Sequence, residues 1–433
     1  MRSLTRLRLT PILWLALTFS PQLQATTPTD LVDLLTNLLT ENEEIIAANA
    51  AVEAESLRAK AALGKWYPNL DLTLNSGSQN NHADDGSVAT SESKLKLTQL
   101  LWDFGATNTA LEISRLRLQE QELALQKLQQ RLILDGATAV IKLNRAAKLL
   151  NFSQQSEENI RRQTGLEEIR VSGGMGFSTD LLQSQAQLAA AKARRLQNEG
   201  DYALAANRYY ELFGITADLK LQTADPALPP LLAKLPPQLA DAITLGLDQN
   251  QELRLAHLAD KRLELEVHRT RANELLPIID LSLEESQRYN DAGISGSDKH
   301  ETIAKIELRL PFNLGLAGVR TVDAAVADAF AQRQSTLTQA KAVERQIRDA
   351  WLQLEVSQSR AESLLLQSEI SAAFLELARR ERELGNRSLL DVLSGETALI
   401  NARSDAEAAQ IDTLLAALNL LNALAMLQLE LLQ

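Results

Sequence analysis

Two long stretches of this 433-residue chain contain no proline, and their length restricts the possible folds more than any other feature. Of the 11 prolines, none lies between Pro68 and Pro226, and none follows Pro311. A proline inside a helix removes a hydrogen bond and costs about 3 kcal/mol, so such stretches permit very long helices. Five prolines gather in residues 225–237, which we predict to be a linker between two halves of the chain.

The two halves on either side of this linker resemble each other. Three segments of the first half recur in the second half in the same order, at offsets of 209, 210 and 211 residues. An offset that drifts so little indicates an internal duplication. The matched segments are residues 67–75 with 276–284, 101–105 with 311–315, and 174–191 with 385–402.

Each repeat is predicted to run through a helix, a β-hairpin, a long helix, a tip turn and a last helix. The first repeat covers residues 26–224 and the second covers residues 238–433, with 225–237 as the Pro-rich linker. The paired elements are first helices at about 29–65 and 238–275, hairpins at 69–101 and 278–310, and tip turns at 172–178 and 384–388.

The longest uninterrupted helical pattern lies between residues 315 and 384. Its apolar residues recur mostly at spacings of three, four or seven, which is typical of a coiled coil. About 70 residues at 1.5 Å each would reach roughly 105 Å, far longer than a globular core needs. The residues that set the pattern are Val319, Val322, Val326, Phe330, Leu337, Val343, Ile347 and Trp351.

In the two hairpins the period changes to two, which indicates strands. Leu70, Leu72 and Leu74 alternate with polar residues, and the second hairpin repeats this with Ile306 and Leu308. Four strands cannot close a barrel, because roughly eight are the practical minimum. Either the sheet packs on the chain's own helices, or several copies contribute strands to one shared barrel.

Aromatic residues gather where strand meets helix, at one end of both hairpins. This placement is typical of the aromatic belt that a membrane barrel carries at the lipid–water interface. The alternative is that the rings only fill the junction between helix and strand. The residues are Trp66, Tyr67, Trp102, Phe104 and Phe312.

The first 25 residues predict export. Arg2, Arg6 and Arg8 precede an apolar run, and residues 23–25 (LQA) end in a small residue suitable for cleavage. The run is too short for a helix that crosses a membrane, so residues 1–25 are expected to be a signal peptide. The absence of Cys excludes disulfides and thiolate metal sites, and the net charge of −12 argues against nucleic acid as a partner.

Residues that could carry catalysis are scarce. The four His show no metal-binding spacing. The glycine-rich residues 173–176 follow a helix and lack the Lys of a phosphate-binding loop. We therefore expect neither an enzyme nor a bound metal or other cofactor.

In this combination of features the chain resembles the TolC-like outer-membrane factors, the outer membrane efflux protein family, over residues 30–430. The resemblance rests on the duplicated plan, on Pro68 and Pro277 before the strands, and on residues 99–105 (QLLWDFG). It also rests on two glycine turns, each followed by a helix that begins with an Asp in its first residues. Residues 100–107 (LLWDFGAT) are reminiscent of members that serve protein secretion, including the type I route.

The resemblance implies a mainly α-helical chain with a membrane β-barrel portion. Three copies would form a homotrimer in outer-membrane lipid, and each would give four strands to one 12-stranded barrel. The helices would form a periplasmic tunnel that meets a periplasmic adaptor (membrane fusion) protein and an inner-membrane ABC or proton-driven transporter. The implied function is a passive export duct for small-molecule drugs or for type I secreted polypeptides.

At the second tip, residues 384–393 (LGNRSLLDVL) are similar to the family pattern for a closed entrance. The resemblance assigns Arg387 to the ties that hold the entrance shut, with Thr179 and Asp180 as its partners. It assigns Asp391 to an acidic ring at the constriction. The tip turns that meet the adaptor would contain Gly174, Gly176, Gly385 and Ser388.

Some positions depart from the family pattern. Ser394 stands where a second constriction Asp is expected, and Arg382 stands where a gate tyrosine is expected. The helix starts at residues 41–45 (ENEEI) and 249–253 (QNQEL) lack the proline usual after Asn. Ion selectivity and the ties of the closed state are therefore open at this point.

Two other interpretations also stay open. Ser388 and Asp391 form a Ser-x-x-Asp capping pattern, which satisfies free N–H groups at a helix start without any gate. A periplasmic coiled-coil scaffold or adaptor protein without a barrel would also explain the long helices. That alternative predicts hairpins that pack on helices.

Overall fold

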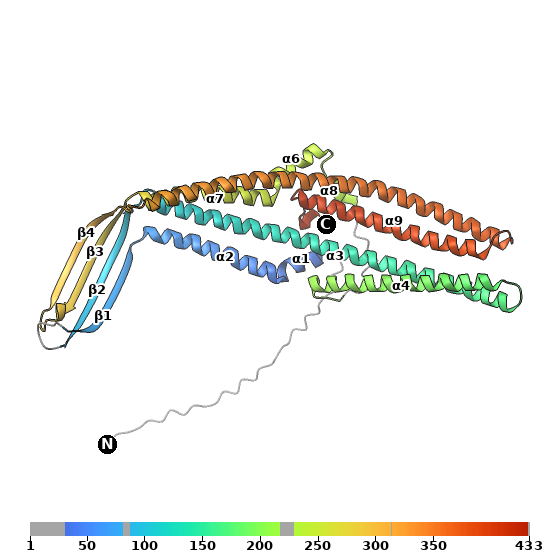
Figure 1. Cartoon of the computed structure of the whole chain (residues 1–433), viewed down its shortest axis with the longest axis horizontal. Helices are drawn as coiled ribbons and strands as arrows, with labels where there is room; N and C mark the ends of the chain where they lie inside the picture. The colour runs from blue at the N-terminus through green and yellow to red at the C-terminus, as the bar shows by residue number, and fades with distance from the viewer. Residues whose placement is uncertain (1–30, 81–86, 217–228, 313, 432–433) are drawn as a thin grey trace, which may run out of the picture.

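The computed structural model describes residues 31–80, 87–216, 229–312 and 314–431. The predicted signal peptide, residues 1–25, and residues 225–228 of the predicted linker lie outside these ranges. The described chain is elongated, with a β-sheet at one end and the tips of two helical hairpins at the other (Figure 1).

In the first half of the chain, short helices lead into a β-hairpin, a long helix then runs to the far end of the molecule, and the chain turns back. The elements are α1 (Leu31–Glu41), α2 (Glu43–Leu63), the short turn η1 (Gly64–Trp66), β1 (Asn69–Asn80), β2 (Ser87–Trp102), α3 (Ala106–Ser172) and α4 (Ser178–Phe213).

The second half follows the same order after a five-residue helix, α5, which lies inside the segment predicted to be a linker. The two long helices α3 and α8 have 67 residues each, so each is about 100 Å long at the usual helical rise. The elements are α5 (Pro229–Ala233), α6 (Leu239–Gln249), α7 (Gln251–Leu275), β3 (Ile278–Tyr289), η3 (Asp291–Gly293), β4 (Lys299–Arg309), α8 (Ala317–Glu383), α9 (Leu389–Ala423) and η4 (Leu429–Leu431).

The first helix of each half is interrupted, so the prediction of single helices over residues 29–65 and 238–275 was wrong. Both breaks fall at an asparagine that caps the helix after it. Asn42 Oδ1 accepts a hydrogen bond from the N–H two residues on at 2.9 Å, and Asn250 Oδ1 does the same at 2.9 Å. Because an Asn side chain can replace a helical backbone bond, each helix ends and restarts without a proline.

The four strands form one antiparallel sheet in the order β1-β2-β3-β4, so the two hairpins join through β2 and β3. Leu70 lies opposite Leu97, and Leu97 lies opposite Leu283. Beyond them Leu281 pairs with Ile306. The apolar residues of all four strands therefore share one face, because opposite residues in an antiparallel ladder point to the same side.

The other face of the sheet carries charged residues that pair across strands. Lys94 Nζ lies 2.5 Å from Glu284 Oε1, and Arg288 Nε lies 3.0 Å from Glu92 Oε1. On the apolar face Leu72 is 66% exposed. Figure 1 shows the sheet beyond the ends of the helices rather than against their sides. The scaffold alternative predicts hairpins that pack on the chain's own helices, and the structure does not have this arrangement.

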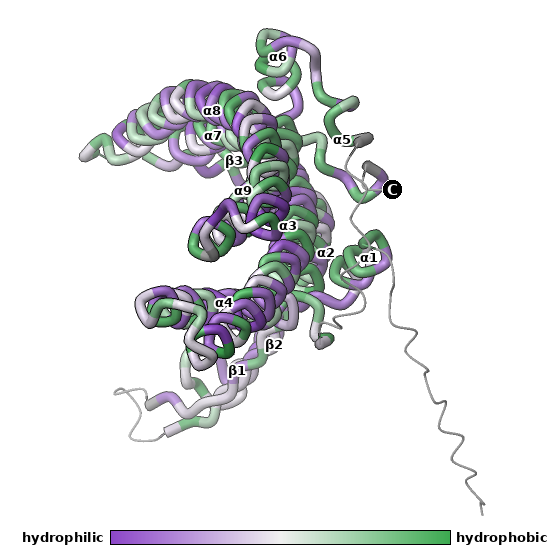
Figure 2. Tube along the Cα trace, turned by 90° about the vertical axis from the view of Figure 1, so that its right-hand side faces the viewer, coloured by the Kyte–Doolittle hydropathy of each residue, from purple (hydrophilic) through white to green (hydrophobic). Residues whose placement is uncertain are grey.

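The main apolar core lies in the middle of the molecule, where the last turns of α9 pack against the other helices. Leu418, Leu421 and Leu427 are at most 2% exposed and contact apolar residues of α1 and α3. A second cluster joins the same segment to α6 and α8, where a Cβ on Gly246 would clash with Ile347. Figure 2 shows mostly hydrophobic residues in α1 and α6, and a mixture of hydrophilic and hydrophobic residues along α8.

Candidate entrance site at the tips of the helical hairpins

Both helical hairpins end in the same backbone turn. In each, the turn glycine donates its N–H to the carbonyl three residues back, and the next residue donates to the carbonyl five residues back, which is a Schellman cap. Gly174 has a φ of +74° and Gly385 a φ of +78°, a left-handed backbone that glycine adopts without strain. The four bonds measure 2.9–3.0 Å and join Gly174 to Val171, Met175 to Arg170, Gly385 to Arg382, and Asn386 to Glu381.

Gly176 at the first tip is required for a different reason. A Cβ at this position would lie 2.9 Å from Val171 Cγ2 and 3.1 Å from Glu167 Oε1. Real Cβ atoms rarely come so close to their neighbours, so packing against the end of α3 restricts this position to glycine.

The helices that leave the two tips begin differently. Ser388 Oγ accepts a hydrogen bond from the Asp391 N–H at 3.2 Å, which confirms the predicted capping pattern. Phe177 holds the corresponding place before α4, where it makes no side-chain cap and is 75% exposed. Capping therefore explains Ser388, but it does not explain why Asp180 recurs at the position of Asp391.

The Arg387 side chain lies back along α8. Its Nε is 2.7 Å from Glu381 Oε2, and its guanidinium carbon is 5.3 Å from the centroid of the Phe374 ring, close enough for a cation–π contact. Within one chain, Arg387 therefore pairs with Glu381 and not with Thr179 or Asp180, as far as the described residues go. The tie between them stays a prediction.

A buried carboxylate that the sequence reading missed connects the two tips. Glu167 on α3 is 3% exposed, and its Oε2 lies 3.3 Å from Arg170 Nη1 and 3.7 Å from Arg382 Nη2 on α8. Arg382 Nη1 also donates to the Arg387 carbonyl at 3.5 Å. The position where the family pattern has a tyrosine thus carries an ionic link between the two hairpins.

Polar links continue along the interface between the α3–α4 hairpin and the α8–α9 hairpin, which we call the hairpin interface. Glu396 on α9 is 3% exposed, pairs with Arg379 of α8, and accepts a hydrogen bond from Gln163 Nε2 of α3 at 3.5 Å. Further from the tips, Lys148 Nζ lies 2.7 Å from Glu407 Oε1. The partners that come from different hairpins, Gln163 with Glu396 and Lys148 with Glu407, lie more than 200 residues apart in the chain, so no local pattern could have revealed them.

The α3–α4 hairpin has a buried carboxylate of its own. Glu157 is 4% exposed, and its Oε2 lies 2.6 Å from Arg195 Nε on α4. The hydrogen bond to Glu157 raises the pKa of the Arg195 guanidinium above its ordinary value. This pair holds α3 and α4 together, whereas Glu167 and Glu396 link one hairpin to the other.

The aromatic residues predicted to form a belt lie where the sheet joins the helices. Trp66 is half-buried, and its Nε1 donates to Asn108 Oδ1 of α3 at 3.1 Å, a contact that both interpretations allow. The other four rings are between 46% and 77% exposed, and their role as a belt stays a prediction. They are Tyr67, Trp102, Phe104 and Phe312.

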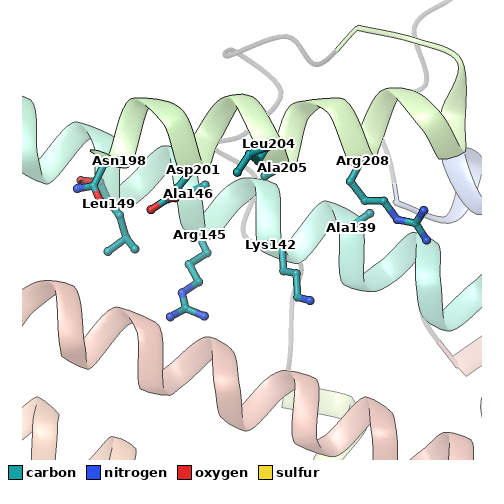
Figure 3. Close-up of a pocket in the computed structure, with 10 residues that line it drawn as sticks. All are labelled: Ala139, Lys142, Arg145, Ala146, Leu149, Asn198, Asp201, Leu204, Ala205 and Arg208. Atoms are coloured by element: carbon teal, nitrogen blue, oxygen red, sulfur yellow. Dashed lines mark hydrogen bonds between the residues drawn. The ribbon is translucent and has the colours of Figure 1, made fainter. Parts of the chain in front are cut away.

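A hollow of about 390 Å³ lies between α3 and α4 (Figure 3). Lys142 and Arg145 line it from α3, Asp201 lines it from α4, and Arg145 Nη1 reaches Asp412 of α9 at 3.2 Å. None of the lining residues is a Ser, Thr, Cys or His.

In the part of the chain that the structure describes, no group of His, Cys, Asp or Glu could hold a metal ion. None of the described helices is long and apolar enough to span a membrane.

The sequence pattern of the family described as "Outer membrane efflux protein" matches residues 34–215. The chain is 25% identical to the outer membrane protein TolC of Escherichia coli over 415 residues, which cover 89% of this chain and 80% of that protein. It is also 25% identical to protein CyaE of Bordetella pertussis over 300 residues, 66% of this chain and 60% of CyaE.

Among solved structures, the chain is similar to the outer membrane protein VceC of Vibrio cholerae. The TM-score is 0.76 at 17% identity, and the match covers 91% of this chain and 95% of VceC. At this identity the similarity shows a shared fold and nothing more. The helical part and the four strands together are therefore the architecture of a known outer-membrane protein.

Proposed function

The chain is a TolC-like outer-membrane factor that lies in the outer membrane and extends into the periplasm, and from this premise we propose that three copies form one passive export duct. Each copy would contribute its four strands to a shared 12-stranded barrel and its helices to a periplasmic tunnel. The duct would perform no catalysis, so the energy for export would come from a transporter in the inner membrane.

The sheet is the observation that carries this proposal. It has an exposed apolar face and a face of cross-strand ion pairs, and within the described residues β1 and β4 have no strand on their outer sides. A single membrane-inserted sheet would leave the N–H and C=O groups of its edges without partners, and a closed barrel removes both edges. Three such sheets joined edge to edge would turn Leu70 and Leu72 toward lipid and Lys94 and Glu284 toward the lumen.

Exposed apolar residues along α8 support an assembly of several copies. Phe330, Leu352 and Ile370 are 63%, 58% and 62% exposed in the single chain. Phe330 belongs to the coiled-coil pattern predicted for residues 315–384, in which Val343 and Ile347 are buried within the protomer. Neighbouring copies in a trimer would cover the exposed ones.

The tips provide a surface for a partner at the far end of the tunnel. Met175, Phe177 and Leu384 beside the two turns are 73%, 75% and 77% exposed. Such apolar side chains at a polar tip fit docking of a periplasmic adaptor protein, which would connect the duct to an ABC or a proton-driven transporter. The tip glycines Gly174 and Gly385 would shape that contact.

The cargo is either small toxic molecules or type I secreted polypeptides, since one tunnel serves both. The LLWDFGAT segment, residues 100–107, favours the polypeptide. Genes next to the coding sequence would discriminate: an ABC exporter with a large repetitive substrate supports secretion, and a proton-driven pump supports efflux.

The duct is tested by extraction, imaging and electrophysiology on the full-length protein. We expect it to need detergent for extraction from outer membranes, to show three-fold symmetry in projection with a rod over roughly 100 Å long, and to form channels in planar bilayers. A protein that leaves the membrane with salt alone and forms no channel would overturn the proposal.

The gate at the tips is a separate part of the proposal. Arg387 would hold the entrance shut by binding Thr179 and Asp180 of a neighbouring copy, where Thr179 is exposed and Asp180 is half-exposed in the single chain. Arg387→Glu places a carboxylate against Asp180, so single-channel conductance should rise several-fold, whereas Arg387→Lys should change it little. Equal conductance of wild type and Arg387→Glu would remove Arg387 from this role.

A further inference from the structure

The side chain of Asn290 ties the loop between β3 and β4, residues 290–298, to the sheet. Asn290 Oδ1 accepts a hydrogen bond from the Gly296 N–H at 2.7 Å, and Asn290 Nδ2 donates to the Ala89 carbonyl of β2 at 2.7 Å. Asn290 has a φ of +53°, a backbone that Asn tolerates better than most residues. This asparagine therefore closes the loop on itself and also ties it to the first hairpin.

The β3–β4 loop is a compact body with its own hydrogen bonds. It contains the short turn η3, and a hydrogen bond from the Asp291 N–H to the Ser297 carbonyl joins its two ends before the chain enters β4. The bonds within it include Asp291 N–H to Ser297 carbonyl at 2.7 Å, Ile294 N–H to Asp291 carbonyl at 3.2 Å, Ser297 N–H to Ile294 carbonyl at 3.2 Å, and Asn290 N–H to Asp298 Oδ1 at 3.3 Å.

The loop lies over the polar face of the sheet. Gly293 is buried, and a Cβ on it would lie 3.3 Å from Gln79 Cβ. Gln79 is an odd-numbered residue of β1, so it points to the side opposite Leu70, Leu72 and Leu74. A hollow of about 450 Å³ between the loop and the sheet is lined by Glu92 and Arg288, which belong to the same polar face.

The loop also lies at the end of the sheet that is remote from the helices (Figure 1). Since the helices extend into the periplasm, this end faces the cell exterior. In a closed barrel the polar face becomes the lumen, so each copy would place one folded loop inside the outer mouth.

We propose that the β3–β4 loop narrows the outer mouth of the duct and sets the size of solute that can enter from outside. This inference rests on the proposed function, because the polar face encloses a lumen only in the closed barrel. Three loops, one from each copy, would form the constriction, and Asn290 would be the residue that positions each of them.

Polymer exclusion in planar bilayers tests the constriction without depending on the gate at the tips. Protein added to one chamber inserts with its loops toward the other chamber, because the long polar helices cannot cross the bilayer. Polyethylene glycols of increasing size, added on the loop side, lower single-channel conductance only if they enter the outer mouth. We expect Asn290→Gly, and more strongly replacement of residues 291–297 by two glycines, to admit polymers larger than wild type admits.

Asn290→Asp separates the two hydrogen bonds that the Asn290 side chain makes. The aspartate keeps an acceptor for the Gly296 N–H but has no donor for the Ala89 carbonyl. If the tie to β2 positions the loop, the size cut-off on the loop side should shift with Asn290→Asp as it does with Asn290→Gly. The cut-off for polymers added on the helix side should stay that of wild type in all variants.

A disulfide tests where the loop lies, since the chain has no cysteine of its own. The pair Gln79→Cys and Gly293→Cys places Cβ atoms about as close as a disulfide needs, and both thiols should resist alkylation after oxidation of intact outer membranes. Gly296 also has a positive φ but would have no atom within 4 Å of a Cβ, so Gln79→Cys with Gly296→Cys is the matched control that should stay reduced.

The outcomes separate the inference from the function on which it rests. If wild-type protein forms no channel, the proposed duct fails and the constriction fails with it. If wild type forms channels but loop replacement leaves the polymer cut-off unchanged, or if the Gln79–Gly293 pair stays reduced, the constriction alone is overturned. A larger cut-off in the Asn290 variants, together with the disulfide, supports it.

Discussion

The hairpin interface differs between the middle of the molecule and the tips. In the middle, α9 meets α3 through buried apolar side chains such as Leu421. Toward the tips the apolar contact shrinks to a small cluster around Ile160 and Leu393, and charged pairs such as Glu167 with Arg382 join the hairpins beside it. Separating apolar surfaces costs free energy in proportion to their area, whereas parted ion pairs recover hydration. We therefore expect the hairpins to stay together in the middle and to part more easily at the tips.

The largest effect should come from breaking the apolar part of this interface. Leu421→Ala removes a fully buried side chain and leaves a cavity, which should lower the free energy of unfolding by about 2–5 kcal/mol. Leu384→Ala at the second tip, where the side chain is 77% exposed, is the control and should change it by about 0.5 kcal/mol or less. Denaturant unfolding of the purified protein in detergent measures both, and similar losses would contradict the comparison.

A smaller effect on stability, but a specific effect on the tips, is expected from Glu167→Gln. The substitution removes the charge that Arg170 and Arg382 share and should cost about 1–3 kcal/mol at the tips. Because the link joins the two hairpins, single-channel conductance should rise.

The control for this prediction is Glu158→Gln on the same helix. Glu158 is exposed and, among the described residues, pairs with Arg161 and Arg162 of α3 itself, so its loss should leave conductance unchanged. A double-mutant cycle with Arg382→Ala would show whether Glu167 acts through Arg382. If Glu167→Gln and Glu158→Gln conduct alike, the ionic link does not hold the tips together.

Periodicity and duplication were enough to predict the long helices, the strands and the turns, because these depend on neighbours in sequence. The end of α8 at Glu383 and the glycine turn after it could be predicted from Gly385 alone. The link from Glu167 to Arg382 could not, since its members meet only after two hairpins have folded together. The breaks at Asn42 and Asn250 were not predicted, because the helical period of the sequence continues on both sides of each capping asparagine.

The two tips can be compared directly by exchanging their caps. Ser388→Ala removes the acceptor for the Asp391 N–H and should destabilise the first turn of α9 by about 1 kcal/mol. Phe177→Ser supplies such an acceptor to α4 and should stabilise its first turn by a similar amount. Hydrogen exchange at the amides of each first turn measures the change, and the exchange should become faster at α9 and slower at α4.

The control is a substitution that keeps a capping hydroxyl at residue 388. Ser388→Thr keeps a hydroxyl at the same position and should leave exchange at α9 close to that of wild type. If Ser388→Thr accelerates exchange as much as Ser388→Ala does, then the hydroxyl is not what stabilises this turn, and the two tips differ for another reason.

The smallest effect on stability should come from Asp391→Asn, which also distinguishes a cap from an acidic ring. The Asp391 N–H still reaches Ser388 Oγ after the change, so only the attraction between the carboxylate and the helix N-terminus is lost, about 0.3–1 kcal/mol. If three copies of Asp391 surround one axis, the loss of three charges should still weaken block of the channel by multivalent cations. Glu158→Gln, at an exposed carboxylate that pairs within α3, is the control. Equal block in wild type and Asp391→Asn would leave Asp391 as a helix-start residue, whereas weaker block in Asp391→Asn alone would place it on the axis.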